Sequence, residues 1–146
     1  MTAKEYLLRY RDAYREAQSI ELKITQLRLK YGYPSAITYS DMPKAHNTER
    51  DLSDYIVKLD ELTGHLVERY SKCVGIEGDI LKRIDSMEIL EEREVLRMCY
   101  TYIDDKGRLM RWEDVAERMH VVRMTATRIH GRALQHFPMN DVHNVL

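Results

Sequence analysis

The chain is poor in residues that cross-link or interrupt a backbone: its 146 residues include two cysteines, three prolines and six glycines. Two cysteines that form no C-x-x-C pair exclude a disulfide-rich scaffold, and we expect Cys73 and Cys99 to be reduced, half-buried residues of a cytoplasmic protein. The scarcity of helix breakers is typical of a helical protein. With 44% hydrophobic residues, the composition also excludes wholesale disorder.

Signatures of membrane proteins and enzymes are absent as well. The first residues, MTAKEYLLRYRDAYREA, are charged throughout, unlike a signal peptide, and no apolar run is long enough to span a bilayer. The sequence has no nucleophile elbow, phosphate-binding glycine loop or pair of catalytic carboxylates. His120, His130 and His136 are spaced by ten and six residues, which matches no common zinc arrangement. We therefore expect no enzyme, cofactor, metal site or membrane partner.

The charge of the chain is nearly balanced but unevenly distributed, with a formal net charge of −1. Residues 88–105 carry six acids and two arginines, whereas residues 106–137 carry seven lysines and arginines and three acids. The acidic run comprises Glu91, Glu92 and Glu94 and is interpreted as a solvated helix face, with contact to a basic protein surface as the less favoured alternative. The basic segment predicts a local binding site for a polyanion.

Two stretches, residues 3–31 and 48–84, have apolar residues at alternating steps of three and four, which predicts two long helices. The first stripe consists of Ala3, Tyr6, Tyr10, Ala13, Ala17, Ile20, Ile24, Leu27 and Tyr31. Residues 32–47 between them are rich in glycine, proline, serine and aspartate, and they predict a loop.

Adjacent striped helices joined by one loop most simply pack antiparallel, so we predict a coiled-coil-like helical hairpin over residues 1–84 in which Tyr10 lies near Tyr70. Gly75 and Gly78 interrupt the second helix, at a cost of about 0.5–1 kcal/mol each relative to alanine. Two interpretations of them remain open. They make room for the N-terminal residues, which we favour, or they form a hinge to the C-terminal unit.

Residues 85–137 predict a small C-terminal unit, followed by a tail over residues 138–146. Asp85 and Glu88 resemble a capping box that begins its first helix. Two short helical patterns follow, joined by a tight turn: the first has Trp112, Val115, Ala116 and Met119 on one face, and the second has Val122, Ala126, Ile129 and Ala133. Small residues at the predicted crossing, Ala116 and Ala126, are typical of a helix-turn-helix.

The outer face of the last predicted helix carries no acid. It comprises the candidate DNA-binding residues Arg123, Met124, Thr125, Thr127, Arg128 and Arg132. An arginine side chain presents a fork of donors that fits guanine edges and phosphate oxygens, and a threonine can donate to a phosphate or contact a thymine methyl group. A helix N-terminus near Arg123 adds backbone donors for an anion. We therefore predict double-stranded DNA as the partner.

The segment WEDVAERMHVVRMTATRIHGRAL resembles the promoter-binding fourth region of bacterial sigma factors, through Trp112 to Ala116, Arg123, Ile129 and the Ala133-Leu134 pair. Together with the N-terminal sequence and an SDMPK motif in the loop, it resembles phage and prophage late-gene transcription regulators of the ArpU/RinA type, over nearly the full chain. The resemblance implies base reading by Arg123, Met124, Thr127 and Arg128, and a contact with RNA polymerase.

Two residues depart from the sigma pattern. Val122 occupies the position of the usual serine or threonine cap, whose loss typically costs about 1 kcal/mol. Met124 occupies the position of an acid that can read cytosine. The target sequence of sigma factors therefore does not transfer to this chain.

The expectation from the sequence is an all-α protein: a long antiparallel hairpin followed by a sigma-like helix-turn-helix. The function expected is that of a sequence-specific DNA-binding transcription regulator in the cytoplasm of a bacterial host. A second hypothesis is a coiled-coil interaction or assembly protein, such as a phage DNA-packaging component, because the unbroken heptads of residues 3–31 could pair between chains. A homo-oligomer is compatible with both.

Overall fold

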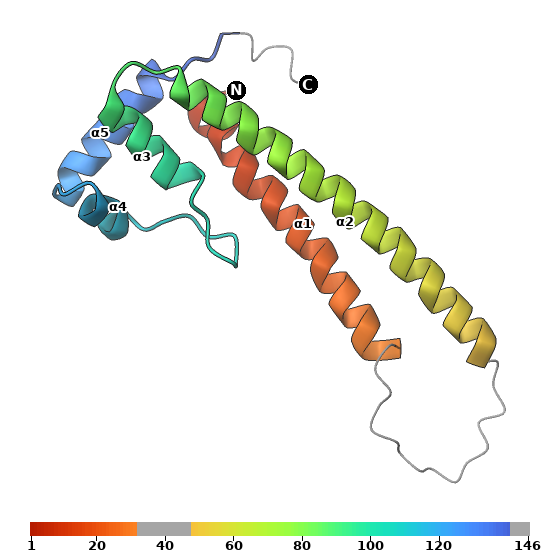
Figure 1. Cartoon of the computed structure of the whole chain (residues 1–146). Coiled ribbons are helices and arrows are strands. Elements are labelled where there is room, and N and C mark those ends of the chain that lie inside the picture. The colour runs from red at the N-terminus through yellow and green to blue at the C-terminus, as the bar shows by residue number, and fades with distance from the viewer. Residues whose placement is uncertain (32–47, 141–146) are drawn as a thin grey trace.

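A computed structural model describes residues 1–31 and 48–140, and their side chains except those of residues 48–51. The described chain forms five helices: α1 (Ala3–Tyr31), α2 (Thr48–Asp85), α3 (Leu90–Tyr100), α4 (Trp112–Arg118) and α5 (Arg123–His136) (Figure 1). The predicted all-α class is confirmed. None of these helices has a stretch apolar and long enough to cross a membrane. The predicted loop with its SDMPK motif, and residues 141–146 of the tail, lie outside the described residues.

Helix α1 begins with a reciprocal cap. The Thr2 hydroxyl oxygen accepts a hydrogen bond from the Glu5 backbone N–H at 3.2 Å, and the Glu5 carboxylate accepts one from the Thr2 backbone N–H at 2.7 Å. These bonds satisfy donors at the helix start that have no partner within the helix. Hydrogen bonding of the Glu5 carboxylate to the Thr2 backbone and, to a lesser degree, to the Thr2 side chain lowers the pKa of Glu5.

Helices α1 and α2 run antiparallel and side by side along most of their length (Figure 1). Ala13 and Ala17 are buried in their seam, where small side chains allow a close approach. Tyr70 contacts Tyr14 with ring centroids 6.5 Å apart, and the Tyr10 carbonyl faces Cys73. The predicted register was therefore wrong by one helical turn, because Tyr70 lies opposite Tyr14 rather than Tyr10.

Both cysteines are free and more deeply buried than the half-buried state that we predicted. Cys73 lies in the seam between α1 and α2, and Cys99 lies on the buried side of α3 in the core. Burial raises the pKa of the Cys99 thiol to about 12. A thiol of this kind has almost no thiolate at neutral pH and is chemically inert.

Helix α2 continues without interruption past Gly75 and Gly78 to Asp85. A Cβ atom built on either glycine would meet nothing within 4 Å, and both residues are exposed. The interpretation that these glycines make room for the N-terminal residues is therefore wrong, since no part of the described chain approaches them.

Replacing Gly75 with alanine should raise the free energy of unfolding by about 0.5–1 kcal/mol, because the helix keeps its geometry and the unfolded chain loses freedom. Urea unfolding followed by circular dichroism measures this gain. Gly107 provides the contrasting control: its φ of +71° and the Arg15 side chain 3.0 Å from its Cβ position predict that Gly107→Ala destabilises. A loss of stability in Gly75→Ala would contradict the solvent exposure of this position.

The predicted capping box at Asp85 and Glu88 was wrong. Asp85 is the last residue of α2, and its carboxylate forms an ion pair with Arg97 of α3. Helix α3 begins at Leu90, after Ile89, whose side chain forms no capping hydrogen bond. Asp85, which resembled a capping residue in the sequence, therefore links α2 to α3 instead.

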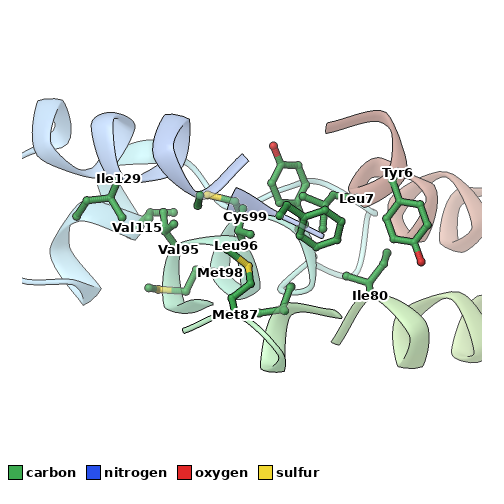
Figure 2. Packing of buried hydrophobic residues seen from close by; sticks show 14 of the residues in the cluster. Tyr6, Leu7, Ile80, Met87, Val95, Leu96, Met98, Cys99, Val115 and Ile129 are labelled. Carbon is green, nitrogen blue, oxygen red and sulfur yellow. The ribbon is translucent and has the colours of Figure 1, made fainter. Parts of the chain in front are cut away.

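The core lies at one end of the long helix pair, where α3 and α5 pack against the start of α1 and the end of α2 (Figure 1). Figure 2 shows Leu7 of α1 and Ile80 of α2 in one cluster with Leu96 of α3. The rings of Tyr6 and Phe137 lie 5.7 Å apart, which joins α1 to the end of α5. The core is therefore continuous across the boundary predicted at residue 85.

Candidate nucleic-acid interface

The turn between α4 and α5 is formed by a left-handed residue. His120 has a φ of +56°, a conformation that favours glycine but that histidine adopts more readily than most side chains. The Val121 N–H donates to the Ala116 carbonyl and the His120 N–H donates to the Glu117 carbonyl, both at 3.1 Å. This pair of bonds is a Schellman motif, which ends α4 and turns the chain into α5.

The apolar faces of α4 and α5 pack on each other and on α3. Val115, Ala116, Ala126, Ile129 and Ala133 are all buried. Trp112 is half-buried, and its ring lies edge-on to His130 with centroids 5.0 Å apart. This packing fixes which side of α5 faces solvent.

All six candidate DNA-binding residues lie on α5, with Met124 and Arg128 on its outermost side and Thr125 and Thr127 on opposite flanks. Arg123, Met124, Arg128 and Arg132 are exposed, whereas Thr125 and Thr127 are half-buried. None of them contacts α1 or α2 through a hydrogen bond or ion pair of the described residues. Helix α5 contains no acidic residue.

The side chains of this face differ in the partners that they already have within the chain. Arg123 forms an ion pair at 3.1 Å with Glu113 at the start of α4. The Thr127 hydroxyl donates to the Met124 carbonyl at 2.8 Å, which orients its methyl group. Among the described residues, the Arg128 side chain hydrogen-bonds the Met124 sulfur at 3.8 Å and forms no ion pair, so its guanidinium is available to a ligand. Met124 itself is 66% exposed.

One residue of this face was missed by the sequence reasoning. Met124, Arg128, Gly131 and Gln135 are all exposed and follow one another at steps of four, three and four, so they form the outermost line of α5. The same spacing is visible in the sequence and could have identified Gln135. A glutamine amide can donate to and accept from an adenine edge.

The N-terminus of α5 lacks a side-chain cap, as the sequence predicted. Val122 has an extended conformation with a ψ of 156°, and its side chain forms no capping hydrogen bond. Replacing Val122 with serine should raise the free energy of unfolding by about 1 kcal/mol, because a hydroxyl at this position can accept a hydrogen bond from the first turn. Urea unfolding of Val122→Ser and Val122→Ala tests this, since only serine can cap; equal stabilities would contradict the prediction.

His130 is on the inner side of α5 and links three helices. Its Nε2 atom lies 2.7 Å from the Tyr100 hydroxyl. Burial and, to a lesser degree, Lys4 lower the pKa of His130, whereas burial and Cys99 raise the pKa of Tyr100. Both side chains are thus neutral at pH 7, and one proton is shared in the hydrogen bond between the Tyr100 hydroxyl and Nε2.

This pKa shift predicts a pH-dependent stability. The unfolded chain binds a proton on His130 at a higher pH than the folded chain does, so the contribution of this residue is complete above a pH of about 6.5 and decreases as the pH falls below it. Urea midpoints at pH 7.5 and 5.5 measure the decrease. In His130→Gln, which keeps a polar group near Tyr100 but does not titrate, the decrease should be smaller; an equal decrease would contradict this assignment.

The acidic run of α3 is not a uniform solvated face. Glu91 is exposed, but Glu92 is only 2% exposed and its carboxylate lies 2.9 Å from Nδ1 of His136 at the end of α5. Our interpretation of Glu92 was therefore wrong. His130 and His136 both have hydrogen-bond partners within the described chain, Tyr100 and Glu92.

No protein-family model, curated protein or solved structure matches this chain.

Proposed function

We propose that the chain is a sequence-specific DNA-binding transcription regulator that inserts α5 into the major groove. The observation that carries this proposal is the exposed outer side of α5, which has three arginines and no acid. In this interpretation α4, its turn and α5 form a helix-turn-helix, in which α5 is the recognition helix. The sequence resemblance to sigma-like and ArpU/RinA-type regulators is compatible with it.

The dimensions of the helix suit this role. Helix α5 has 14 residues and is therefore about 21 Å long, and the major groove is about 12 Å wide and admits one helix. The first turn of α5 contains no acidic residue, so backbone donors at its N-terminus can bind a phosphate group beside the Arg123–Glu113 ion pair.

We assign separate roles to the side chains of α5. Arg128, which has no acidic partner in the described chain, reads a guanine through a bidentate contact. Thr127 and Met124 supply apolar contacts to thymine methyl groups. Arg132, two turns beyond the N-terminus, holds a phosphate. Arg123 must give up its ion pair with Glu113 before it can bind a phosphate, and this lowers the free energy that its contact with DNA contributes.

A contact with RNA polymerase is a further part of the proposal. The exposed acid Glu91 lies in the first turn of α3, on a helix that is separate from the basic face. DNA on α5 would therefore leave this acid free to meet a basic protein surface. We propose a cytoplasmic regulator of phage or prophage type that binds both partners.

The assembly hypothesis ranks second. It was based on the heptads of α1, and in the structure these residues pack on α2 of the same chain, as the burial of Ala13, Ala17 and Ile24 indicates. A packaging component remains the alternative if the chain prefers packaging-site DNA or another protein to a promoter.

Selection of binding sites from a pool of random duplexes tests the proposal. The proposal predicts an enriched motif, and an affinity for it that falls steeply with salt because phosphate contacts release counterions. A double variant, Arg128→Ala with Arg132→Ala, should lose both the motif and most of the affinity. If the wild-type chain enriches no sequence and binds no duplex at low salt, the proposal is wrong.

A further inference from the structure

A line of exposed residues runs along α2 on its solvent side. It consists of Asp60, Gly64, Val67, Ser71, Val74, Gly78 and Lys82, which we call the α2 outer stripe. Steps of three and four place these residues on one helix face, and all of them are exposed. Val67 and Val74 expose 62% and 66% of their surface. They adjoin an open hollow whose lining includes Leu66 and Tyr70.

Small residues alternate with the valines along the stripe. Gly64, Ser71 and Gly78 recur at every seventh position, and a Cβ atom on either glycine would meet nothing within 4 Å. Each glycine destabilises the helix, and no packing inside the described part of the chain requires it. Glycine does permit close approach of another backbone, and large side chains that alternate with small ones are suited to interdigitate with a second helix.

The stripe has the same order of residue types in both directions from Ser71. A valine lies three or four residues away on each side, and a glycine lies seven residues away on each side. A surface that is its own complement is the requirement for a two-fold symmetric dimer, in which the same patch of both copies meets.

The charges at the ends of the stripe select the direction of pairing. Asp60 and Lys82 each lie eleven residues from Ser71, and neither forms an ion pair with the described residues. In an antiparallel pair, Asp60 of each copy would face Lys82 of the other. In a parallel pair, like charges would meet at both ends, which is unfavourable.

We propose that the α2 outer stripe binds the same stripe of a second copy of this chain, antiparallel and around a two-fold axis at Ser71. Gly64 then lies opposite Gly78 of the second copy, and the valines pack beside the small residues. Because α2 leads into the C-terminal unit, the dimer carries its two α5 helices at opposite ends. The dimer does not depend on the proposed DNA binding.

Light scattering during gel filtration of the full chain tests the dimer. The expected mass is twice the 17.4 kDa of one chain. Ser71→Arg places two like charges together on the axis and should weaken the dimer by about a hundredfold or more. His65→Arg adds the same charge at an exposed position of α2 outside the stripe and should leave the dimer intact. A wild-type monomer at all concentrations, or a dimer that Ser71→Arg does not weaken, would overturn the proposal.

Charge exchange tests the direction of pairing, and cysteine cross-linking tests the position of the axis. Asp60→Lys and Lys82→Asp should each weaken the dimer, and their combination should restore it, whereas a combination that stays weak would overturn the antiparallel arrangement. Under oxidation, Ser71→Cys should form an interchain disulfide on the two-fold axis, and His65→Cys should not. Equal cross-linking of the two variants would contradict the axis at Ser71, and circular dichroism verifies that each variant is folded.

Discussion

Replacing Arg128 with alanine should lower the affinity for the selected duplex by about 1–3 kcal/mol, or roughly 5- to 150-fold, and relax the base preference at one position. The physical reason is that a bidentate contact to guanine discriminates against the other bases. The Arg128 guanidinium forms no ion pair with the described residues, and hydrogen-bonds the Met124 sulfur, so it breaks no ion pair there to reach the groove. Fluorescence anisotropy with the selected duplex and single-base variants measures both effects.

Arg132→Ala gives the matched comparison within the same helix. If Arg132 holds a phosphate, its loss should weaken binding to all duplexes alike. It should also reduce the salt dependence of binding by about one released counterion. Arg28→Ala removes the same charge from an exposed position at the end of α1, far from α5 in Figure 1, and should change neither property. Unchanged affinity in both α5 variants would exclude the roles that we assign to them.

Replacing Leu7 with alanine should lower the free energy of unfolding by about 2–5 kcal/mol, a large part of the 5–15 kcal/mol that is typical of a domain. Leu7 is 0% exposed and lies in the cluster that joins α1 to α3 and α5. Its loss removes apolar contacts and leaves a cavity that rigid helices cannot fill. Urea unfolding measures the difference, and Leu22→Ala, at a position that is 59% exposed, should change stability by about 0.5 kcal/mol or less.

The Leu7 variant also tests whether the chain unfolds as one unit. Trp112 is the one tryptophan of the sequence and reports on α4, whereas circular dichroism is dominated by α1 and α2. Since the core is continuous between these parts, both signals should move to the same lower midpoint in Leu7→Ala. A tryptophan midpoint that does not move would mean that the C-terminal unit unfolds independently.

The helical spans were predictable because the signals for them are local. The stripe of residues 3–31 predicted the bounds of α1, and the predicted end of α2 differs by one residue from Asp85. The acid-free side of α5 was also visible in the sequence, since the spacing of Ala126, Ile129 and Ala133 identifies the opposite, buried side. Periodicity along the chain is therefore enough to predict where helices begin and end and which side of each is buried.

The register of α1 against α2 was not predictable in the same way. A stripe that repeats at every turn can slide by one turn with little change in its own contacts, so Tyr70 could pair with Tyr10 or Tyr14. Contacts at the end of the helix pair are specific to one register: Tyr6 meets Phe137 of the C-terminal unit, and the Arg15 guanidinium donates to the Gly107 carbonyl at 3.2 Å. These contacts join residues that are far apart in the sequence.

The periodic sequence by itself determined where this protein is helical and which sides of its helices are apolar, because both depend on residues within a few turns of each other. Only the tertiary structure decided that Glu92 is buried against His136, that Asp85 joins two helices and that the glycines of α2 face open space. Each of these depends on which distant segment lies beside a residue, and that is set by packing of the whole chain.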